Sequence, residues 1–428
     1  MPSPSAVPAV FDAVVLARAP TAQTKLLGIT LAERGRRVAV RAGARRVYVA
    51  DSEAAIERLA AWDRERGDAG LLVVRAGDQL VHLPLVTPLV AASGDRRIAV
   101  GPGGEYAGAL WADAAHAASV IAAITVSPET AEQNLVAGWP SATRVRHGDI
   151  ARHAATTPDE QRGAERMLLQ LLIKPAEDSP VSKYVYRPLS RPLTRALLHT
   201  PITANQVSLI VAVIGLAGCA LTALPSQAAL VAGAFLVFLS CVVDGCDGEI
   251  SRMKLTSSPF GAWLDTVIDE VTQVSYFFAI GYHTYQHHPS GWLAGSIALG
   301  GVCYVATIYA IYFFSIVVIK KGGSQYYAGD LEIVDANGAP ALRPRVKVST
   351  APAWAKALGQ VFLYMIRRDF INLAALAVAL FDGYVVIYAG IWLGTVVAAA
   401  IIVPEHLRLH RQLAEIRRRG GVPRYVSA

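Results

Sequence analysis

Residues 227–252 read QAALVAGAFLVFLSCVVDGCDGEISR, an apolar run of membrane-spanning length that leads directly into Asp244 and Asp247. A second acidic pair, Asp265 and Asp269, follows a short distance along the chain. Carboxylates in or beside a bilayer are costly, so such a cluster is by default the hypothesis of a functional site. Spacings of three and four residues place each pair on one face of a helix, and two facing helices would bring the four carboxylates together. Hard oxygen ligands of this kind favour magnesium, manganese or calcium.

Long apolar runs dominate the chain around this stretch, and they predict an all-α membrane domain over residues 206–404. Each run is close to the roughly 20 residues that a bilayer requires. The six predicted spans are 206–224, 227–246, 259–284, 291–318, 362–381 and 384–404. The fifth is interrupted by Arg367, Arg368 and Asp369, so its embedded part can begin as late as Phe370.

The formal net charge of +7 fits either a nucleic acid or a membrane surface as partner, and the positions of the basic residues decide between them. Between residues 201 and 405, every lysine and arginine lies in or at the edge of one of two connections, the one after the second predicted span and the one between the fourth and fifth. This asymmetry is typical of the positive-inside rule. It predicts a multi-pass protein of the inner (cytoplasmic) membrane, with both termini and the aspartates on the cytoplasmic side. No nucleic-acid partner is expected.

Residues 1–165 mix apolar and charged residues in the way of a soluble domain. Short apolar runs that alternate with helical patterns predict buried parallel strands and an α/β fold. The strands are expected at Val14–Ala17, Val47–Ala50 and Leu71–Val74, with a helix over Ser52–Arg66. Residues 166–205, where basic and apolar side chains interleave, predict an amphipathic juxtamembrane element. A polar segment at 320–357 is expected to form a cytoplasmic loop or small hairpin, and the basic tail 405–428 a helix.

The aspartates belong to a longer pattern, Asp-x2-Asp-Gly-x2-Ser-Arg-x8-Gly-x3-Asp-x3-Asp. Its fixed positions are Asp244, Asp247, Gly248, Arg252, Gly261, Asp265 and Asp269. The pattern resembles the signature of the CDP-alcohol phosphotransferase (CDP-alcohol phosphatidyltransferase) family, in which alanine usually stands in place of Ser251. The resemblance covers residues from about 170 to 405. It implies a homodimeric membrane enzyme that moves a phospho-alcohol or phosphatidyl group from a CDP-alcohol to an acceptor hydroxyl with release of CMP, in phospholipid or inositol-phosphodiester synthesis.

The family resemblance also implies roles for single residues. The implied ligands of two Mg²⁺ or Mn²⁺ ions are Asp244, Asp247, Asp265 and Asp269, and Asp269 is also the implied general base for the acceptor hydroxyl. Gly248 and Gly261 would allow close approach of the nucleotide, and Arg252 would hold a phosphate with two donors. The run Thr203-Ala-Asn205-Gln-Val-Ser208 resembles the element that opens the first span in the family, where Asn205 would cap the helix near the CDP group.

Two further segments resemble the branch that contains di-myo-inositol-phosphate phosphate synthases, namely the run from Lys174 to Arg195 and Arg367-Arg368-Asp369-Phe370. The membrane enzyme of that branch is often fused to an N-terminal inositol-phosphate cytidylyltransferase, so residues 1–165 are expected to adopt a nucleotidyltransferase-like (Rossmann-like) fold. Active enzymes of this type carry a glycine-rich phosphate loop after the first strand, whereas residues 16–25 hold no glycine. A degenerate domain is therefore expected.

Lys25 and Asp78 are the expected remnants of the site in that domain. A bifunctional enzyme that also makes the CDP-alcohol from CTP is the alternative.

Other residues leave alternatives open. Arg367 and Arg368 could bind an acceptor phosphate or anchor a helix at the membrane interface. A histidine cluster, His283, His287 and His288, could bind a metal or lie in a solvated loop. A cation transporter that uses the aspartates as its path is a rival from another class, although the spans show no duplicated halves. The sequence defines neither the donor alcohol nor the acceptor.

Overall fold

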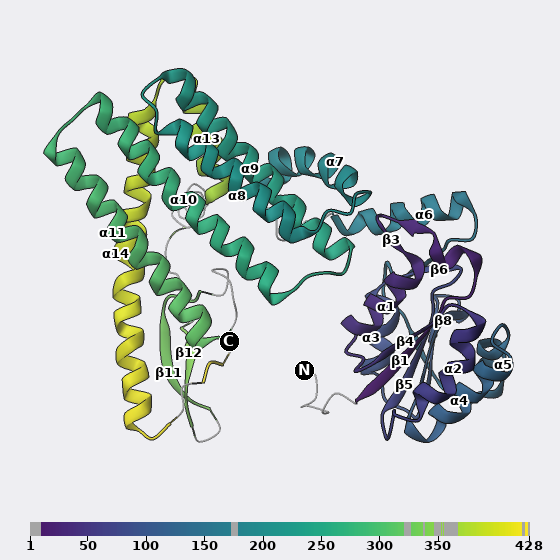
Figure 1. Cartoon of the computed structure of the whole chain (residues 1–428). Coiled ribbons are helices and arrows are strands. Elements are labelled where there is room, and N and C mark those ends of the chain that lie inside the picture. The colour runs from purple at the N-terminus through teal and green to yellow at the C-terminus, as the bar shows by residue number, and fades with distance from the viewer. Residues whose placement is uncertain are drawn as a thin grey trace. The chain divides into compact units, whose positions relative to one another are not determined.

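The computed structural model describes residues 10–172, 179–320, 327–336, 339–345, 352, 354, 367–421 and 424–426. The chain forms two compact units (Figure 1). The first unit comprises residues 1–174, 195–201 and 249–256. The second comprises residues 175–194, 202–248 and 257–428. Two short stretches that follow residue 174 along the chain, 195–201 and 249–256, therefore belong to the N-terminal unit.

A six-stranded mixed sheet forms the centre of the first unit. Its order is β4 (Val47–Ala50), β1 (Phe11–Leu16), β5 (Gly70–Arg75), β8 (Tyr106–Ala112), β7 (Arg96–Val100) and β9 (Thr143–Arg146). β1 pairs in parallel with β4 and β5, which confirms the three predicted parallel strands, whereas β8 is antiparallel to both of its neighbours. All six residues of β1 are buried, as expected for a strand whose two faces are both covered.

Helices cover both faces of this sheet (Figure 1). On one face, α1 (Leu31–Arg41) and α3 (Leu83–Ala91) share an apolar core with the sheet. On the other face lie α2 (Glu53–Asp63), α4 (Ala114–Val126) and α5 (Ala131–Gly138). The helix predicted over Ser52–Arg66 is α2, and the Ser52 side chain caps it by accepting a hydrogen bond from the Ala55 N–H. The predicted α/β class of this region is confirmed.

Shorter elements complete the first unit. They are η1 (Pro20–Gln23), β2 (Lys25–Leu26), β3 (Ile29–Thr30), β6 (Gln79–Val81), β10 (Arg152–Ala154), α6 (Pro158–Leu169) and η2 (Gln170–Leu172).

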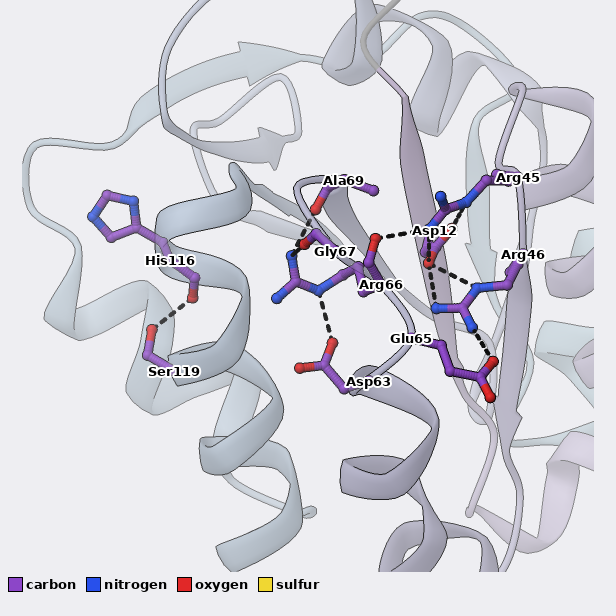
Figure 2. Close-up of polar contacts among 10 residues, drawn as sticks. All are labelled: Asp12, Arg45, Arg46, Asp63, Glu65, Arg66, Gly67, Ala69, His116 and Ser119. Atoms are coloured by element: carbon purple, nitrogen blue, oxygen red, sulfur yellow. Dashed lines mark hydrogen bonds and ion pairs between the residues drawn. The ribbon is translucent and has the colours of Figure 1, made fainter.

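Asp12 is a fully buried carboxylate on β1. Figure 2 shows that the guanidinium groups of Arg45 and Arg46 both point at it, with donor–acceptor distances of 2.7–3.0 Å. Burial alone would raise the pKa of Asp12, but the hydrogen bonds and charges of the two arginines outweigh burial and hold the pKa below its usual value. This ion pair fixes the connection between α1 and β4 to the first strand.

The second unit is built mainly from long helices, and each of the six predicted spans corresponds to one of them. They are α8 (Ala204–Thr222), α9 (Gln227–Met253), α10 (Pro259–His287), α11 (Gly291–Phe313, continued by the π-helix η4, Phe314–Val318), α13 (Arg368–Ala379) and α14 (Tyr384–Arg418). Residues 362–366, the predicted start of the fifth span, lie outside the described residues.

Four of these helices are long and apolar enough to cross a membrane: α8, α9, α11 with its extension, and α14. The count of six spans is therefore not confirmed. α10 has ample length, but its polar side chains, including Asp265 and Asp269, lower its hydropathy. The 12 described residues of α13 would rise only about 18 Å.

Glycine allows α8 and α9 to approach at backbone distance. A Cβ atom on Gly218 of α8 would lie 2.8 Å from the Gly233 carbonyl oxygen, and one on Gly233 of α9 would lie 2.6 Å from the Gly218 oxygen. Close contact of this kind through small residues is typical of packed membrane helices. It sets the spacing of the two helices that carry Asn205 and Asp244.

Strands β11 (Leu331–Ala336) and β12 (Ala339–Pro344) pair in antiparallel fashion and confirm the small hairpin that was one of the two predictions for this segment. Residues 337 and 338, which connect the two strands, lie outside the described residues. The hairpin packs against the end of α14, which runs to Arg418 as one helix. The predicted tail is thus helical as far as Arg418, and this helix is continuous with the last predicted span. Residues 182–198 are helical as η3 (Ser182–Tyr186) and α7 (Arg187–Leu198).

Candidate metal and phosphate site

Three of the four predicted aspartates converge in the second unit. One carboxylate oxygen each from Asp244, Asp247 and Asp265 lies within 4.8 Å of the others. The first two come from α9 and the third from α10. The start of α10 is set by Ser258, whose Oγ accepts a hydrogen bond from the Gly261 N–H at 3.0 Å, and by Pro259 at its first position. The predicted convergence of facing helices is therefore found.

The donor set of this trio fits a divalent cation. All three groups are carboxylates, the ligands that hard cations such as Mg²⁺ and Mn²⁺ prefer. Asp247 is buried, and Asp244 Oδ1 is buried with no hydrogen-bond partner within the described part of the chain. Carboxylates so close together repel one another, and a cation among them would remove that repulsion and give the buried Asp244 Oδ1 a partner.

The fourth aspartate, Asp269, is held by an arginine instead of joining the trio. Arg368, at the start of α13, forms an ion pair with Asp269 and donates a hydrogen bond to Asp244 Oδ2 at 2.7 Å. The guanidinium thus supplies positive charge to the edge of the carboxylate cluster. Arg368 was predicted as a ligand of an acceptor phosphate, and the structure places it against two of the aspartates.

Ser208 is a site residue that the sequence reasoning did not single out. It lies on α8, is buried, and its Oγ approaches Asp247 Oδ2 at 2.5 Å. Ser208 and Asn205 are three residues apart and so share one face of α8. This spacing from Asn205, a predicted CDP-binding residue, is the feature of the sequence that could have identified Ser208 as a site residue. A hydroxyl donor fixes the Asp247 carboxylate and leaves its second oxygen to a cation.

The helix-capping role expected of Asn205 is wrong. The N-cap of α8 is Thr203, which forms a capping box with Gln206. Asn205 instead faces α10, because a Cβ atom on Gly261 would lie 3.0 Å from Asn205 Oδ1. Gly261 therefore allows close approach of α8 and α10 at this point.

Gly248 and Arg252 continue α9 beyond Asp247. Gly248 belongs to the second unit, whereas Arg252 lies in the last turn of the helix, which belongs to the first unit. Their predicted contacts with CDP remain predictions.

A pocket of about 310 Å³ adjoins the carboxylate cluster. It is lined by Ser182, Tyr186, Arg187, Ser190, Cys241, Val242, Asp244, Gly245, Arg367, Arg368 and Asp369. The start of α13 is tied to the pocket wall, since Tyr186 donates a hydrogen bond to the Asp369 carbonyl at 2.9 Å. Arg367 pairs with Asp369 at 3.5 Å and keeps about half of its side chain exposed. Arg187, which the sequence reasoning did not assign to the site, adds a third arginine.

The predicted remnant site of the first unit is only partly assembled. A pocket of about 420 Å³ at the ends of β1 and β5 is lined by Arg18, Asp78 and Glu132 among others, but Lys25 is not among its lining residues. The glycine-free segment after β1 forms η1, and the Thr21 hydroxyl donates to the Gly77 carbonyl at 2.7 Å. Burial raises the pKa of Glu132, which accepts a hydrogen bond from the Tyr106 hydroxyl at 2.6 Å.

The histidine cluster ties helices together. His283 is fully buried, and its Nδ1 lies 2.7 Å from the Leu224 carbonyl oxygen, so the prediction of a solvated loop is wrong for this residue. His287 Nε2 lies 2.9 Å from the Pro225 carbonyl oxygen, and His288 Nε2 lies 3.1 Å from the Tyr384 hydroxyl. These contacts connect the end of α10 to the α8–α9 connection and to α14.

Comparison with known proteins relates the C-terminal part of the chain to a family of transferases. Residues 201–380 match the model of the CDP-alcohol phosphatidyltransferase family, and this segment contains the aspartate trio, Asp269 and Arg368. This segment is therefore similar to a domain that transfers phosphate-containing groups. The alternative of a cation transporter is overturned by this match.

Curated relatives narrow the comparison to one branch. The chain is 42% identical over 113 residues to the bifunctional IPC transferase and DIPP synthase of Rubrobacter xylanophilus and 29% identical over 145 residues to the protein of the same name from Thermococcus kodakarensis. These alignments cover 26% and 34% of this chain and only 25% and 32% of the relatives, respectively. They confirm the resemblance to the inositol branch for the matched part.

Proposed function

We propose that the chain is an integral-membrane CDP-alcohol phosphotransferase. It would move a phospho-alcohol or phosphatidyl group from a CDP-alcohol to an acceptor hydroxyl and release CMP, in phospholipid or inositol-phosphodiester synthesis. The observation that carries the proposal is the convergence of Asp244, Asp247 and Asp265, beside the arginine-held Asp269, inside the segment that matches the family.

In this proposal the trio holds divalent cations, Mg²⁺ or Mn²⁺, two ions if Asp269 contributes. When bound, such cations neutralise the negative charge of the CDP pyrophosphate. Ser208 orients the Asp247 carboxylate through its hydrogen bond of 2.5 Å. Gly248, Gly261, Asn205 and Arg252 would surround the nucleotide.

The transfer step uses Asp269 as general base. The acceptor oxygen attacks the phosphorus that bears the donor alcohol, the bond from that phosphorus to the bridging oxygen breaks, and CMP leaves with the bonding electron pair. The acceptor proton passes to the Asp269 carboxylate. Arg368 contacts the Oδ1 atom of Asp269 in this structure, so Oδ2 would be the oxygen that takes the proton.

The arginine-lined pocket of about 310 Å³ is the proposed acceptor site. Arg187 and Arg367 line it together with Arg368, which can turn into it from the aspartates. Guanidinium groups bind phosphate with two donors each, so this lining favours an acceptor that carries a phosphate. An inositol phosphate has that chemistry.

The topology of the proposed enzyme follows the charge distribution. α10 and α13 would complete six spans, with the site and both termini on the cytoplasmic side of the inner membrane. Residues 1–165 would form a degenerate cytidylyltransferase-like domain, followed by the juxtamembrane region 166–205, the membrane domain 206–404 and the tail 405–428. A homodimer would be the assembly, as in the family that the chain resembles.

Replacement of Asp269 by Asn tests the proposal. We expect at least a thousandfold loss of CMP release, because the amide cannot accept the proton. The measurement is CMP formation by membranes supplied with Mg²⁺, candidate CDP-alcohols and inositol phosphate. Asp382→Asn is the matched control, since Asp382 lies in the turn between α13 and α14 with φ of 55°, which asparagine adopts readily. Wild-type CMP release by Asp269→Asn would contradict the proposed role.

A second candidate is the bifunctional enzyme, favoured by the names of the curated relatives and by the pocket beside Asp78. The full chain would be incubated with CTP and a phosphorylated polyol. Pyrophosphate release that is lost in Asp78→Asn would establish this second activity. No release from wild type would leave the transferase as the single activity.

A further inference from the structure

The C-terminal end of α9 is anchored in the first unit by groups that the proposed reaction does not use. Residues 249–256 belong to that unit. Arg34 Nη2 of α1 donates to the Met253 carbonyl at 2.7 Å, and Arg37 Nη1 donates to the Lys254 carbonyl at 2.7 Å. Carbonyls at a helix C-terminus lack partners within the helix, and a cation there opposes the negative end of the helix dipole.

Arg34 is an unusual residue for such a contact because it is only 1% exposed. Its Nε and Nη1 atoms are buried and have no hydrogen-bond partner within the described residues. Burying a guanidinium with so few partners is costly. The one hydrogen bond found for its side chain in the described part of the chain ends on α9.

Leu255, just after the end of α9, is a second point at which the helix end is held in the first unit. The Leu255 N–H donates to the Arg252 carbonyl at 3.3 Å and the Thr256 N–H donates to the Ser251 carbonyl at 2.8 Å, which is the hydrogen-bond pattern of a Schellman motif. Glycine usually occupies the left-handed position of this motif, but here Leu255 adopts it with φ of 54°. The Leu255 side chain is buried in the core shared by α1, α3 and the sheet. Burial in the α/β core thus compensates the backbone strain.

From these contacts we infer that Arg34, Arg37 and Leu255 are positioning residues of the transferase, which fix the last turn of α9 and so orient Arg252. The carbonyls of Arg252 and of the residue after it are both held, the first by the Leu255 N–H and the second by Arg34. The inference rests on the proposed function, in which Arg252 binds a CDP phosphate. It gives the α/β domain a task that requires no glycine-rich loop.

The first test measures the affinity of the full chain in nanodiscs for CDP in the presence of Mg²⁺, by calorimetry. We expect at least tenfold weaker binding for Arg34→Met, Arg37→Gln and Leu255→Gly, and recovery of most of the affinity in Arg34→Lys. Arg36→Gln is the matched control and should stay within twofold of wild type. Arg36 and Arg37 share Glu33 as partner, at 2.6 and 2.7 Å, but only Arg37 donates to α9.

Mn²⁺ affinity without CDP, measured by electron paramagnetic resonance, separates positioning from general damage. The trio lies in the second unit, so the variants should bind Mn²⁺ within twofold of wild type. A parallel loss of Mn²⁺ and CDP affinity would overturn the positioning role. So would CDP affinities of Arg34→Met and Leu255→Gly that both stay within twofold of wild type.

Hydrogen–deuterium exchange keeps the test independent of the proposed function. The peptide over residues 249–256 should exchange at least tenfold faster in Arg34→Met, while β1 and β5 stay protected. If residues 249–256 exchange at the wild-type rate in Arg34→Met, Arg34 does not anchor the end of α9. If wild type binds no CDP at millimolar concentration, the proposed function fails and the exchange result alone decides on the anchor. Loss of protection in β1 would mean that Arg34→Met disturbs the whole first unit. In that case the exchange of residues 249–256 is compared between wild type and Arg37→Gln, because Arg37 is partly exposed.

Discussion

At the scale of single residues, the most consequential side chain is Arg368. It contacts Asp244 and Asp269 at once and so places one positive charge beside both carboxylates. It also lines the arginine pocket. One guanidinium can therefore serve either the aspartates or an acceptor phosphate, and the two roles compete.

Replacing Arg368 by Gln should tighten Mn²⁺ binding about tenfold and weaken binding of a phosphorylated acceptor. Two unit charges about 4 Å apart interact by roughly 4 kcal/mol at an effective dielectric constant near 20. Removal of the guanidinium therefore takes away more repulsion toward Mn²⁺ than the roughly 1.4 kcal/mol that corresponds to a tenfold change in affinity. Mn²⁺ titration followed by electron paramagnetic resonance checks the first effect. Arg367→Gln is the control, because Arg367 pairs with Asp369. Weaker Mn²⁺ binding by Arg368→Gln would show that Arg368 does not compete with the cation.

His82 makes the first unit sensitive to acid. It is buried at the start of α3, where burial and, secondarily, the charge of Arg34 lower its pKa to about 4. In the unfolded chain, His82 takes up a proton near pH 6.5, whereas in the folded chain it does so only near pH 4. The stability of the fold with neutral His82 is therefore unaffected above pH 6.5 and falls as the pH drops from 6.5 toward 4. The expected loss is up to about 1.4 kcal/mol per pH unit across that window.

Urea-dependent proteolysis of residues 70–112 in the full chain, at pH 7, 6 and 5, measures this effect. The His82→Gln variant should lose most of the pH dependence, whereas the exposed His199→Gln should keep it. Equal pH dependence in all three proteins would contradict the assignment to His82.

At the scale of elements, apolar periodicity predicted the positions of β1, β4, β5, α2 and the six long helices well. Side-chain partners across elements were harder to predict. Ser208 could not be assigned to Asp247 without knowing how α8 faces α9, and Arg368 could be placed at the interface but not against the aspartates. The continuity of α14 past residue 404 was also not predicted, because a helix that continues beyond its apolar stretch and packs on a hairpin shows no break in periodicity.

The glycine contact between α8 and α9 predicts a sharp steric effect. A valine at Gly218 would meet the Gly233 carbonyl at 2.8 Å and Val237 at 2.9 Å, so the helices must separate. Overpacking of this kind costs typically about 1–3 kcal/mol. We expect a lower thermal unfolding midpoint in detergent and weaker Mn²⁺ binding. Gly295→Val on α11, where an added Cβ meets nothing within 4 Å, should leave both nearly unchanged. An unaltered midpoint for Gly218→Val would argue against this contact.

At the scale of the whole molecule, hydropathy finds the helices that face lipid more readily than those that line a site. α10 carries Asp265 and Asp269 and for that reason fails a criterion of length and apolarity that α8, α9, α11 and α14 meet. The division of the chain into units was also not predictable from composition. The last turn of α9 joins the first unit through Arg34, Arg37 and Leu255. These contacts join residues far apart in the sequence, and no local sequence pattern predicts them.

We propose above that the aspartate trio is the metal centre of a CDP-alcohol transferase. The most direct test is the rate of CMP release by the full chain as Mn²⁺ is titrated after removal of divalent cations, for wild type, Asp265→Asn and the control Asp382→Asn. We expect no CMP release without Mn²⁺ and a Mn²⁺ requirement at least tenfold higher in Asp265→Asn than in the other two. CMP release that needs no divalent cation, or an unchanged Mn²⁺ requirement in Asp265→Asn, would contradict it.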